Sequence, residues 1–473
     1  MATQHAIPTT PDLNETGVQT LLDGLRGDVL RPEDGGYDEA RTVWNGMIDR
    51  RPALIARCSG TADVVACVDF AREHDLLLSV RGGAHNVAGN AVNDGGLVID
   101  LSNMRGVSVD PERRIVRVQG GATWGDVDRE TQLFGLATPG GQVSTTGVAG
   151  LTLHGGLGAL HRKYGLAIDN LLSVEIVTAD GQVRTASATE HEDLFWAVRG
   201  AGSNFGVVTW FEFALHPVGP EIAMVVPIFA LEDAPAVLRK YRAFAHALPD
   251  EMGPQALFWS VPAVDDFPAE LHGKPIVAVQ VVYAGDPDKG ERLLQPVLEW
   301  APPLLDLSGR MPYVVMQSAF DAFFPPGLHY YWKSLLLNEL SDAAIDAIVQ
   351  VAAERPSPHA IINVWQLGGA ISRVARDATA FSRRDAEYLL SFDTTWVDPA
   401  DTERCVTWTR QTWSTMQTFG QGGIYLNFAG LGEEKEALVR AGYGSNYDRL
   451  VALKTKYDPT NLFRMNQNIR PTA

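Results

Sequence analysis

The chain has 473 residues, of which 45% are hydrophobic and 20% are charged, a composition typical of a soluble globular protein with a large core. This length exceeds what one hydrophobic core usually organises, so two domains are expected. The net charge of −18 argues against nucleic acid and anionic membranes as partners. No apolar run reaches the roughly 18 residues of a membrane span.

The N-terminus lacks the basic and apolar regions of a signal peptide. The three cysteines, Cys58, Cys67 and Cys405, have no pairing pattern, which favours a reducing compartment and predicts a cytoplasmic protein. None of them has the spacing of a metal ligand, so no metal site is expected.

In the first half of the chain, hydrophobic patterns and turn signals predict a sequence of short elements. Residues 1 to about 14 are expected to be a mobile lead, and Asp180-Gly181 marks the turn of a hairpin over 173–184. The other predicted elements are helices at 18–25, 61–70 and 124–134, and strands at 76–80, 96–101, 114–119 and 207–216.

From about residue 217 the pattern changes to strands followed by long helices. The strand candidates are 223–230, 276–284, 329–337 and 388–393, followed by helices at 235–247, 287–299, 341–354 and 400–418, with further strands at 256–260 and 360–366. This pattern predicts an α+β domain, an antiparallel sheet with helices on one face. Glycines return near 420, where the chain is expected to cross back to the first lobe.

Three glycine-rich turns follow predicted strands, and the first carries a histidine. Gly82 and Gly83 precede His85, a second cluster spans 140–158, and a third spans 200–206. Successive backbone N–H groups in such turns bind anions, so three turns suggest a long phosphate-containing ligand. A lone histidine after a glycine pair is also common in purely structural turns. The Gly200-Ala-Gly202 turn lacks the glycine spacing and following acidic residue of a dinucleotide-binding Rossmann motif.

Several longer segments resemble the FAD-linked oxidases of the vanillyl-alcohol oxidase and p-cresol methylhydroxylase superfamily. The resemblance is to the branch that contains berberine bridge enzyme, and it covers nearly the whole chain in the family's order. It rests on residues 80–86, 140–150, 154–158, 162–170, 193–209, 425–428 and 457–469. The resemblance implies a two-lobed FAD-binding domain from residues 1–216 and 425–473, with a substrate domain, 217–424, inserted between them.

The resemblance also implies the residues of a flavin site. His85 matches the histidine that bonds covalently to the 8α-methyl of FAD, although a noncovalent contact is the alternative. Val143 stands where some relatives have a second attachment through cysteine, so a single link is expected. The implied cofactor-binding residues are Val80, Arg81, Gly82, Gly83, Ala84, His85, Asn86, Gly89, Val143, Ser144, Thr145, Thr146, Gly147, Gly150, Gly155, Gly158, Val207, Tyr425, Asn427 and Asn466.

Tyr425 matches the family's usual catalytic base, and Asn427 is expected to share its strand face. A phenol is a poor base at neutral pH unless its pKa falls. A tyrosine in a strand core is the alternative.

Ser391 and Leu389 replace the catalytic groups of plant relatives, so a berberine-type ring closure is not supported. Tyr388 is a second candidate for the site.

Other residues leave alternatives open. His154 either contacts the flavin or substrate or, the favoured interpretation, is a hydrogen-bonded structural residue. His161, Arg162 and Lys163 are expected on a loop surface. The aromatic residues Trp259, Tyr330, Tyr331, Trp332 and Trp365 either line a pocket or pack in a core.

The function that the resemblance implies is an oxidase that transfers hydride from a hydroxyl-bearing carbon to flavin N5. The small-molecule substrate would be a sugar, a phenolic alcohol or a secondary-metabolite alcohol, with O2 as acceptor and H2O2 as product. Thr146 is small at a position that affects access of oxygen, which favours an oxidase. The alternatives are a dehydrogenase with another acceptor and a flavin-carrying binding protein without turnover.

Overall fold

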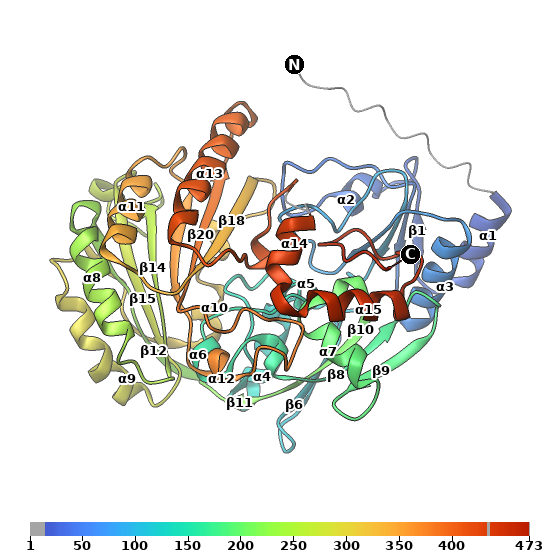
Figure 1. The fold of residues 1–473 in the computed structure, drawn as a ribbon, viewed down its shortest axis with the longest axis horizontal. Helices are drawn as coiled ribbons and strands as arrows, with labels where there is room; N and C mark the ends of the chain where they lie inside the picture. The colour runs from blue at the N-terminus through green and yellow to red at the C-terminus, as the bar shows by residue number, and fades with distance from the viewer. Residues whose placement is uncertain (1–14, 433–435, 473) are drawn as a thin grey trace.

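The computed structural model describes residues 15–432 and 436–472, and it folds into two lobes that meet along the middle of the molecule (Figure 1). The predicted lead, residues 1–14, lies outside the described residues. One lobe contains sheets of four and five strands and the short pair β7 (Leu136–Ala137) and β11 (His216–Pro217), and the other contains a nine-stranded sheet.

The four-stranded sheet carries the first glycine-rich turn. Its order is β1-β2-β4-β3, with β2 and β3 both parallel to the central β4. Helix α1 (Glu15–Gly24) and helix α3 (Thr61–Glu73) pack on it through a shared apolar core, as the apolar spacing of residues 61–70 predicts. The strands are β1 (Asp28–Leu30), β2 (Leu54–Arg57), β3 (Leu78–Arg81) and β4 (Leu97–Asp100).

The five-stranded sheet is antiparallel throughout, in the order β5-β6-β10-β8-β9. The hairpin predicted around Asp180-Gly181 is present, since β8 and β9 pair across that turn. The strands are β5 (Val107–Asp110), β6 (Ile115–Gln119), β8 (Leu171–Val177), β9 (Val183–Ser187) and β10 (Val207–Ala214). The helices that share its core include α4 (Trp124–Thr131) and α7 (Glu192–Ala201).

The second lobe is built on the nine-stranded antiparallel sheet. Its main strands run in the order β13-β15-β14-β19-β20-β18 across the sheet, so neighbours such as β14 and β19 come from distant parts of the sequence. The strands are β12 (Glu221–Val225), β13 (Pro227–Ala230), β14 (Met252–Ser260), β15 (Pro275–Tyr283), β16 (Leu305–Asp306), β17 (Gly309–Pro312), β18 (His329–Leu337), β19 (Ile361–Gln366) and β20 (Tyr388–Trp396).

The four longest helices of this lobe cover one face of this sheet, as the sequence predicts (Figure 1), whereas the short helix α10 (Tyr313–Ser318) packs against Ile222 and Val282 on the opposite face. Alternate strand residues such as Phe258, Val279 and Leu390 point to the helices and form an apolar core with them. The covering helices are α8 (Ala234–Ala245), α9 (Pro287–Leu294), α11 (Asp342–Ala353) and α13 (Thr402–Met416). Most of the opposite face lies towards the first lobe.

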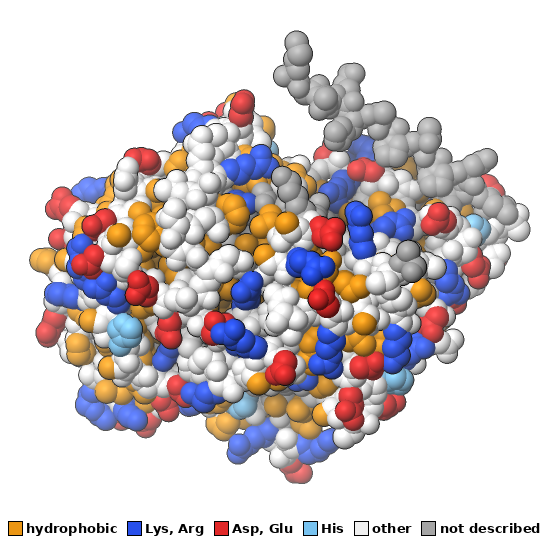
Figure 2. All heavy atoms as spheres, viewed as in Figure 1, with side chains coloured by type: hydrophobic (Ala, Val, Ile, Leu, Met, Phe, Trp, Pro, Cys, Tyr) orange, Lys and Arg blue, Asp and Glu red, His pale blue; other side chains and the backbone are white. Residues whose placement is uncertain are grey.

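After α13 the chain returns to the first lobe. Helices α14 (Glu436–Tyr443) and α15 (Tyr447–Tyr457) pack against the core of the five-stranded sheet. The visible face of the molecule carries acidic and basic side chains interspersed, without a large basic patch (Figure 2). Among the described residues, no helix combines the length and hydrophobicity needed to cross a bilayer.

Candidate functional site

A deep cleft lies between the uncovered face of the nine-stranded sheet and the glycine-rich loops of the first lobe. It contains about 1420 Å³ of space free of protein atoms, part of it open to solvent. Its walls come from the 80–91, 141–157 and 465–467 loops and from β14, β18, β19 and β20.

Two loops of the cleft touch through bare backbone. A Cβ on Gly83 would lie 2.4 Å from the backbone nitrogen of Gly147, and one on Gly158 would lie 1.8 Å from the carbonyl oxygen of Gly140. Any side chain at these positions would push the loops apart. The glycines therefore set the spacing of the loops that form this wall of the cleft.

The His85 side chain lies in the cleft, where its ring stacks on Trp44 at 5.0 Å between ring centroids. Its Nε2 lies 3.0 Å from the Thr145 hydroxyl, and within the described residues its Nδ1 has no hydrogen-bond partner. Burial lowers the pKa of His85 to about 4. The imidazole is therefore neutral at physiological pH, the form that acts as a nucleophile.

Twelve of the residues predicted to bind the cofactor line the cleft. They are Val80, Gly82, Gly83, Ala84, His85, Asn86, Val143, Thr146, Gly147, Gly150, Asn427 and Asn466.

The other predicted residues do not line the cleft. Arg81 donates a hydrogen bond to the Ala40 carbonyl, and Ser144 is bound to the carboxylate of Asp321 in the second lobe. Val207 is buried in the core of the first lobe. The remaining residues that do not line the cleft are Gly89, Thr145, Gly155, Gly158 and Tyr425.

Unpaired polar atoms at the cleft show that it is built for a polar ligand. The Asn90 amide nitrogen Nδ2 and the Asn466 amide oxygen Oδ1 are buried without a hydrogen-bond partner, and both residues line the cleft. A buried polar atom without a partner costs about 1–3 kcal/mol. A ligand with both donors and acceptors, such as FAD, would satisfy them, and the closely packed glycine loops fit such a cofactor.

The hydroxyl of Tyr425 is held by three donors directly behind the cleft wall. It accepts hydrogen bonds from the backbone N–H groups of Gly156 (3.0 Å) and Leu157 (3.1 Å) and from the Asn427 side-chain amide (2.9 Å). Burial raises the pKa of Tyr425, and these three hydrogen bonds lower it. Three donors on one oxygen are the arrangement that stabilises a phenolate.

The prediction that Tyr425 and Asn427 lie on a strand is wrong. Residues Leu426–Phe428 form a single turn of 3-10 helix that begins after Tyr425, and this turn brings Asn427 back to the tyrosine hydroxyl. Their contact therefore comes from the tight turn and not from a shared strand face.

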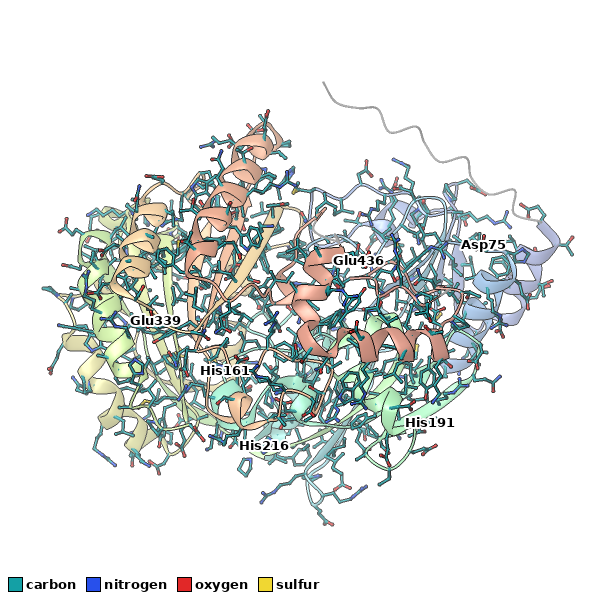
Figure 3. All side chains as sticks on the ribbon, viewed as in Figure 1. Asp75, His161, His191, His216, Glu339 and Glu436 are labelled. Carbon is teal, nitrogen blue, oxygen red and sulfur yellow. The ribbon has the colours of Figure 1, made fainter. Side chains whose placement is uncertain are left out.

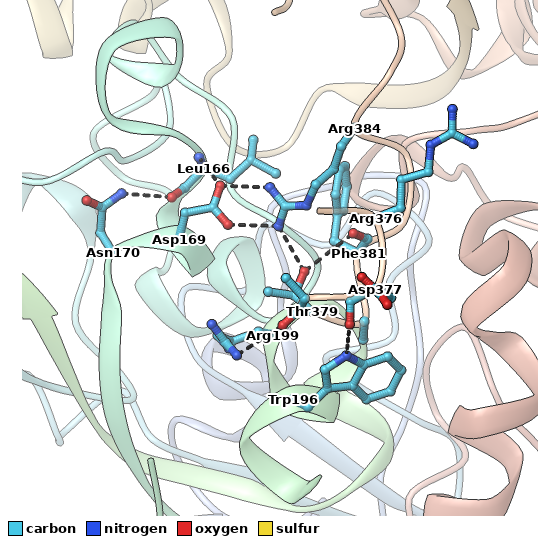
Figure 4. Close-up of polar contacts among 12 residues, drawn as sticks. Leu166, Asp169, Asn170, Trp196, Arg199, Arg376, Asp377, Thr379, Phe381 and Arg384 are labelled. Carbon is cyan, nitrogen blue, oxygen red and sulfur yellow. Dashed lines mark hydrogen bonds and ion pairs between the residues drawn. The ribbon is translucent and has the colours of Figure 1, made fainter. Parts of the chain in front are cut away.

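The loop with the backbone donors Gly156 and Leu157 packs against a segment that ends in a buried ion pair (Figure 4). Ala167 and Ile168 donate to the carbonyls of Gly156 and Gly155, and Asp169, which follows them, forms two hydrogen bonds with Arg384 at 2.7 and 3.0 Å. Both side chains of this pair are almost completely buried. Residues from the second half of the chain thus position the donors of Tyr425.

Of the three basic residues predicted on a loop surface, His161 and Arg162 are buried, and Lys163 is half-buried and donates to the Ala284 carbonyl. His161 lies inside the molecule, in contrast to the exposed His191 (Figure 3). Its two ring nitrogens lie 2.7 Å from the carbonyls of Gly158 and Gln366, and Arg162 donates to the Leu367 carbonyl. These bonds join the first lobe to the end of β19, which corrects the surface prediction.

His154 lines the cleft and is also hydrogen-bonded, since its Nε2 lies 2.9 Å from the Ser203 hydroxyl. Burial lowers the pKa of its imidazole to about 4, so the ring is neutral.

The aromatic candidates divide between the two faces of the sheet. Trp332 and Trp365 line the cleft, and Tyr330 lies behind Trp44 with its ring stacked on it. Trp259 packs in the same apolar cluster, whereas Tyr331 and Tyr388 point to the helix-covered face. Tyr388 is therefore excluded from the site, because its strand position faces away from the cleft.

Asp393, which no sequence motif indicated, is the one carboxylate among the described residues that line the cleft. Its Oδ2 accepts hydrogen bonds from the Asn363 amide (2.5 Å) and the Ser391 hydroxyl (3.2 Å). Burial raises the pKa of Asp393 to about 7, and these two bonds only partly oppose the shift. The only sequence signal for Asp393 was its spacing: it lies four residues after Leu389 on the same strand and therefore on the same strand face.

Comparison with known proteins agrees with the geometry of the cleft. Residues 52–187 match the family model of an FAD binding domain, and residues 424–470 match the model named berberine and berberine like. The two matched segments include the loops that carry His85 and Tyr425.

Similar proteins extend over the whole chain. An FAD-linked oxidoreductase of Dictyostelium discoideum is 32% identical over 96% of this chain and 97% of its own length. The crystal structure of 6-hydroxy-D-nicotine oxidase from Arthrobacter nicotinovorans is 30% identical, with a TM-score of 0.84 over 95% of this chain and 98% of that one. A chitooligosaccharide oxidase is 26% identical, with a TM-score of 0.84 over 97% of this chain and 100% of that one.

Proposed function

Because the chain belongs to the FAD-linked oxidoreductases of the berberine-bridge-enzyme-like family, we propose that it is an oxidase acting on a small molecule with a hydroxyl-bearing carbon. Bound FAD would supply the hydride acceptor at N5, and reoxidation by O2 would yield H2O2. The observation that supports a turnover enzyme is the Tyr425 hydroxyl, held by three donors beside a cleft that also contains His85.

In this proposal His85 holds the cofactor through one covalent bond. Its neutral ring and its unpartnered Nδ1 among the described residues support a bond from that nitrogen. Val143 lines the cleft where a second attachment would need a cysteine, and the three cysteines are buried elsewhere in the fold. The bond would prevent loss of the cofactor and shift its reduction potential.

Replacing His85 should release the flavin. The His85→Ala variant is expected to lose free FAD on acid precipitation, whereas the wild type keeps its yellow colour through a single bond. His154→Ala is the matched control, because it removes another neutral histidine of the cleft and should keep the attachment. Flavin that stays with the precipitated His85→Ala protein would show that the attachment is elsewhere.

Thr146 lines the cleft beside the glycine wall, and we propose that its small side chain leaves a path for O2 to the flavin. Thr146→Ile adds bulk on that path and should slow reoxidation of the reduced enzyme in stopped-flow experiments with air-saturated buffer. Reduction by substrate under anaerobic conditions should stay near the wild-type rate. Slow reoxidation of the wild type would instead identify a dehydrogenase with another acceptor.

A flavin-carrying binding protein is distinguished by a simpler test. Bleaching of the flavin absorbance on anaerobic addition of a substrate demonstrates turnover, and a peroxide-release screen over alcohols, sugars and phenolics would supply that substrate. We also propose a cytoplasmic location, on the basis of the unpaired cysteines.

A further inference from the structure

The cleft-facing side of the nine-stranded sheet presents one buried acidic position among apolar and aromatic residues. The register of β18, β20 and β19 places Asp393 between Trp332 and Ile361 in one row across the three strands. In the next row, Ser391 lies beside Asn363. Cross-strand neighbours of this kind have Cβ atoms about 4.5–5.5 Å apart, so these side chains share one patch of the cleft floor.

This patch contains two acceptor oxygens that no group of the protein satisfies. The Asp393 Oδ1 and the Asn363 Oδ1 are both buried without a hydrogen-bond partner. The Asn363 amide nitrogen is already bound to the other carboxylate oxygen, which fixes the orientation of the amide and points its own oxygen elsewhere. A ligand that fits this patch must therefore bring at least two donors.

No basic side chain in the described part of the chain forms an ion pair with Asp393. Lys333 lies nearby on β18, but it pairs with Phe392 and its amino group sits 4.0 Å from the ring centroid of Trp413 on the helix-covered side. The other titratable groups that line the cleft are His85 and His154, and both are neutral. A buried carboxylate without a cation is costly, and the fold retains it on the wall of a ligand cleft.

We propose that the substrate carries a protonated amine, whose N–H groups bind the Asp393 carboxylate and the Asn363 amide oxygen beside the indole of Trp332. An ammonium supplies both missing donors and the missing positive charge at once. The indole ring adds a favourable contact with a cation. A neutral diol would supply the donors but leave the carboxylate without a counter-charge. This proposal rests on the proposed function, because it assigns the cleft to the substrate.

Binding to the oxidised holoenzyme tests the proposal without turnover. The probes are methylammonium, benzylammonium and 2-phenylethylammonium, each compared with the alcohol of the same shape by titration of the flavin absorbance at pH 8. Each amine that fits should bind about 10–100-fold more tightly than its alcohol, as expected for a charge-assisted hydrogen bond. Asp393→Asn keeps the shape and should remove this preference.

Asp128→Asn is the matched control. Asp128 is also buried, its pKa is also raised to about 7 by burial, and it lies outside the cleft wall, hydrogen-bonded to Gln317. This variant should keep the wild-type preference for amines. Equal binding of amines and alcohols, retention of the preference in Asp393→Asn, or no saturable amine binding to the wild type would each overturn the proposal.

The pH dependence of binding gives a second readout. Amine affinity should fall about tenfold per pH unit below the pKa of Asp393, about 7, as the carboxylate is protonated. Burial lowers the pKa of His154 to about 4, His85 is bonded to the flavin in the holoenzyme under the proposed function, and alkylamines stay protonated until about pH 10, so none of these groups produces this change. Asp393→Asn should show no such dependence.

The two hypotheses fail separately. If amines bind selectively but no amine or alcohol reduces the flavin, the oxidase function fails and the amine site stands. If neutral alcohols reduce the flavin equally well in the wild type and in Asp393→Asn, the oxidase function stands and the amine site fails.

Discussion

Tyr425→Phe is expected to slow anaerobic reduction of the flavin by substrate by about 10²–10⁴-fold, the usual contribution of a general base. The substitution keeps the ring and its packing and removes only the hydroxyl that accepts hydrogen bonds from Gly156, Leu157 and Asn427. Without that oxygen, the hydroxyl proton of the substrate has no positioned acceptor as the hydride leaves. Stopped-flow absorbance of the flavin measures the rate directly, while flavin content and reoxidation should stay near wild type.

The same variant should lose a pH-dependent limb of the reduction rate. Burial raises the pKa of Tyr425 and the three donors oppose the shift, so the fraction of phenolate grows as the pH rises towards that pKa. The wild-type rate should therefore increase with pH, and the Phe variant should not follow it.

Tyr313→Phe is the control for this experiment, since it removes another fully buried hydroxyl, one without a hydrogen-bond partner and away from the cleft. Its reduction rate should equal that of the wild type. An unchanged rate in Tyr425→Phe would assign the base to a group that lines the cleft itself.

The fold of the second lobe was largely predictable because its signals are local. The nearly continuous apolar run of residues 276–283 predicts a strand that is buried on both faces, and the capped helices that follow such strands have ordinary lengths. Strand order was not predictable, because β14 pairs with β19, about a hundred residues away in the sequence. Nothing in either strand's own sequence specifies that partner.

The site divides in the same way. His85 follows a glycine pair at the end of a strand, a pattern also common in structural turns, and the resemblance to the FAD-linked oxidases was needed to assign it to the cofactor site. The position of Asp393 in the cleft could not be predicted from local sequence. It depends on the pairing of β20 with β18 and β19, which places one face of these strands at the floor of the cleft. His161 was misplaced for a related reason, since a polar Arg-Lys neighbourhood suggests a surface, whereas two distant backbone carbonyls satisfy its ring.

The C-terminal helix should depend strongly on a single buried lysine. The Lys454 amino group donates to the Asp458 carboxylate at 2.6 Å and to the carbonyls of Asn204 and Phe463, both at 2.8 Å. Burial lowers the pKa of Lys454 to about 8, and the pairing with Asp458 opposes that shift. Lys454→Met should lower the free energy of unfolding by about 3–5 kcal/mol, because it leaves Asp458 buried without a cation. Chemical denaturation followed by tryptophan fluorescence measures this loss.

Lys456→Met on the same helix is the matched control. Lys456 contacts Asp193 at the same 2.6 Å, but its side chain is 59% exposed, so its loss should cost less than about 1 kcal/mol. The double variant Lys454→Met/Asp458→Asn removes the uncompensated charge and should recover part of the lost stability. Recovery of the free energy of unfolding will be incomplete, because the Asp458 carboxylate also accepts hydrogen bonds from the backbone N–H groups of Leu462 and Phe463. These two residues begin the loop that leads to Asn466 in the cleft. Equal losses in Lys454→Met and Lys456→Met would mean that burial of this ion pair does not anchor that loop.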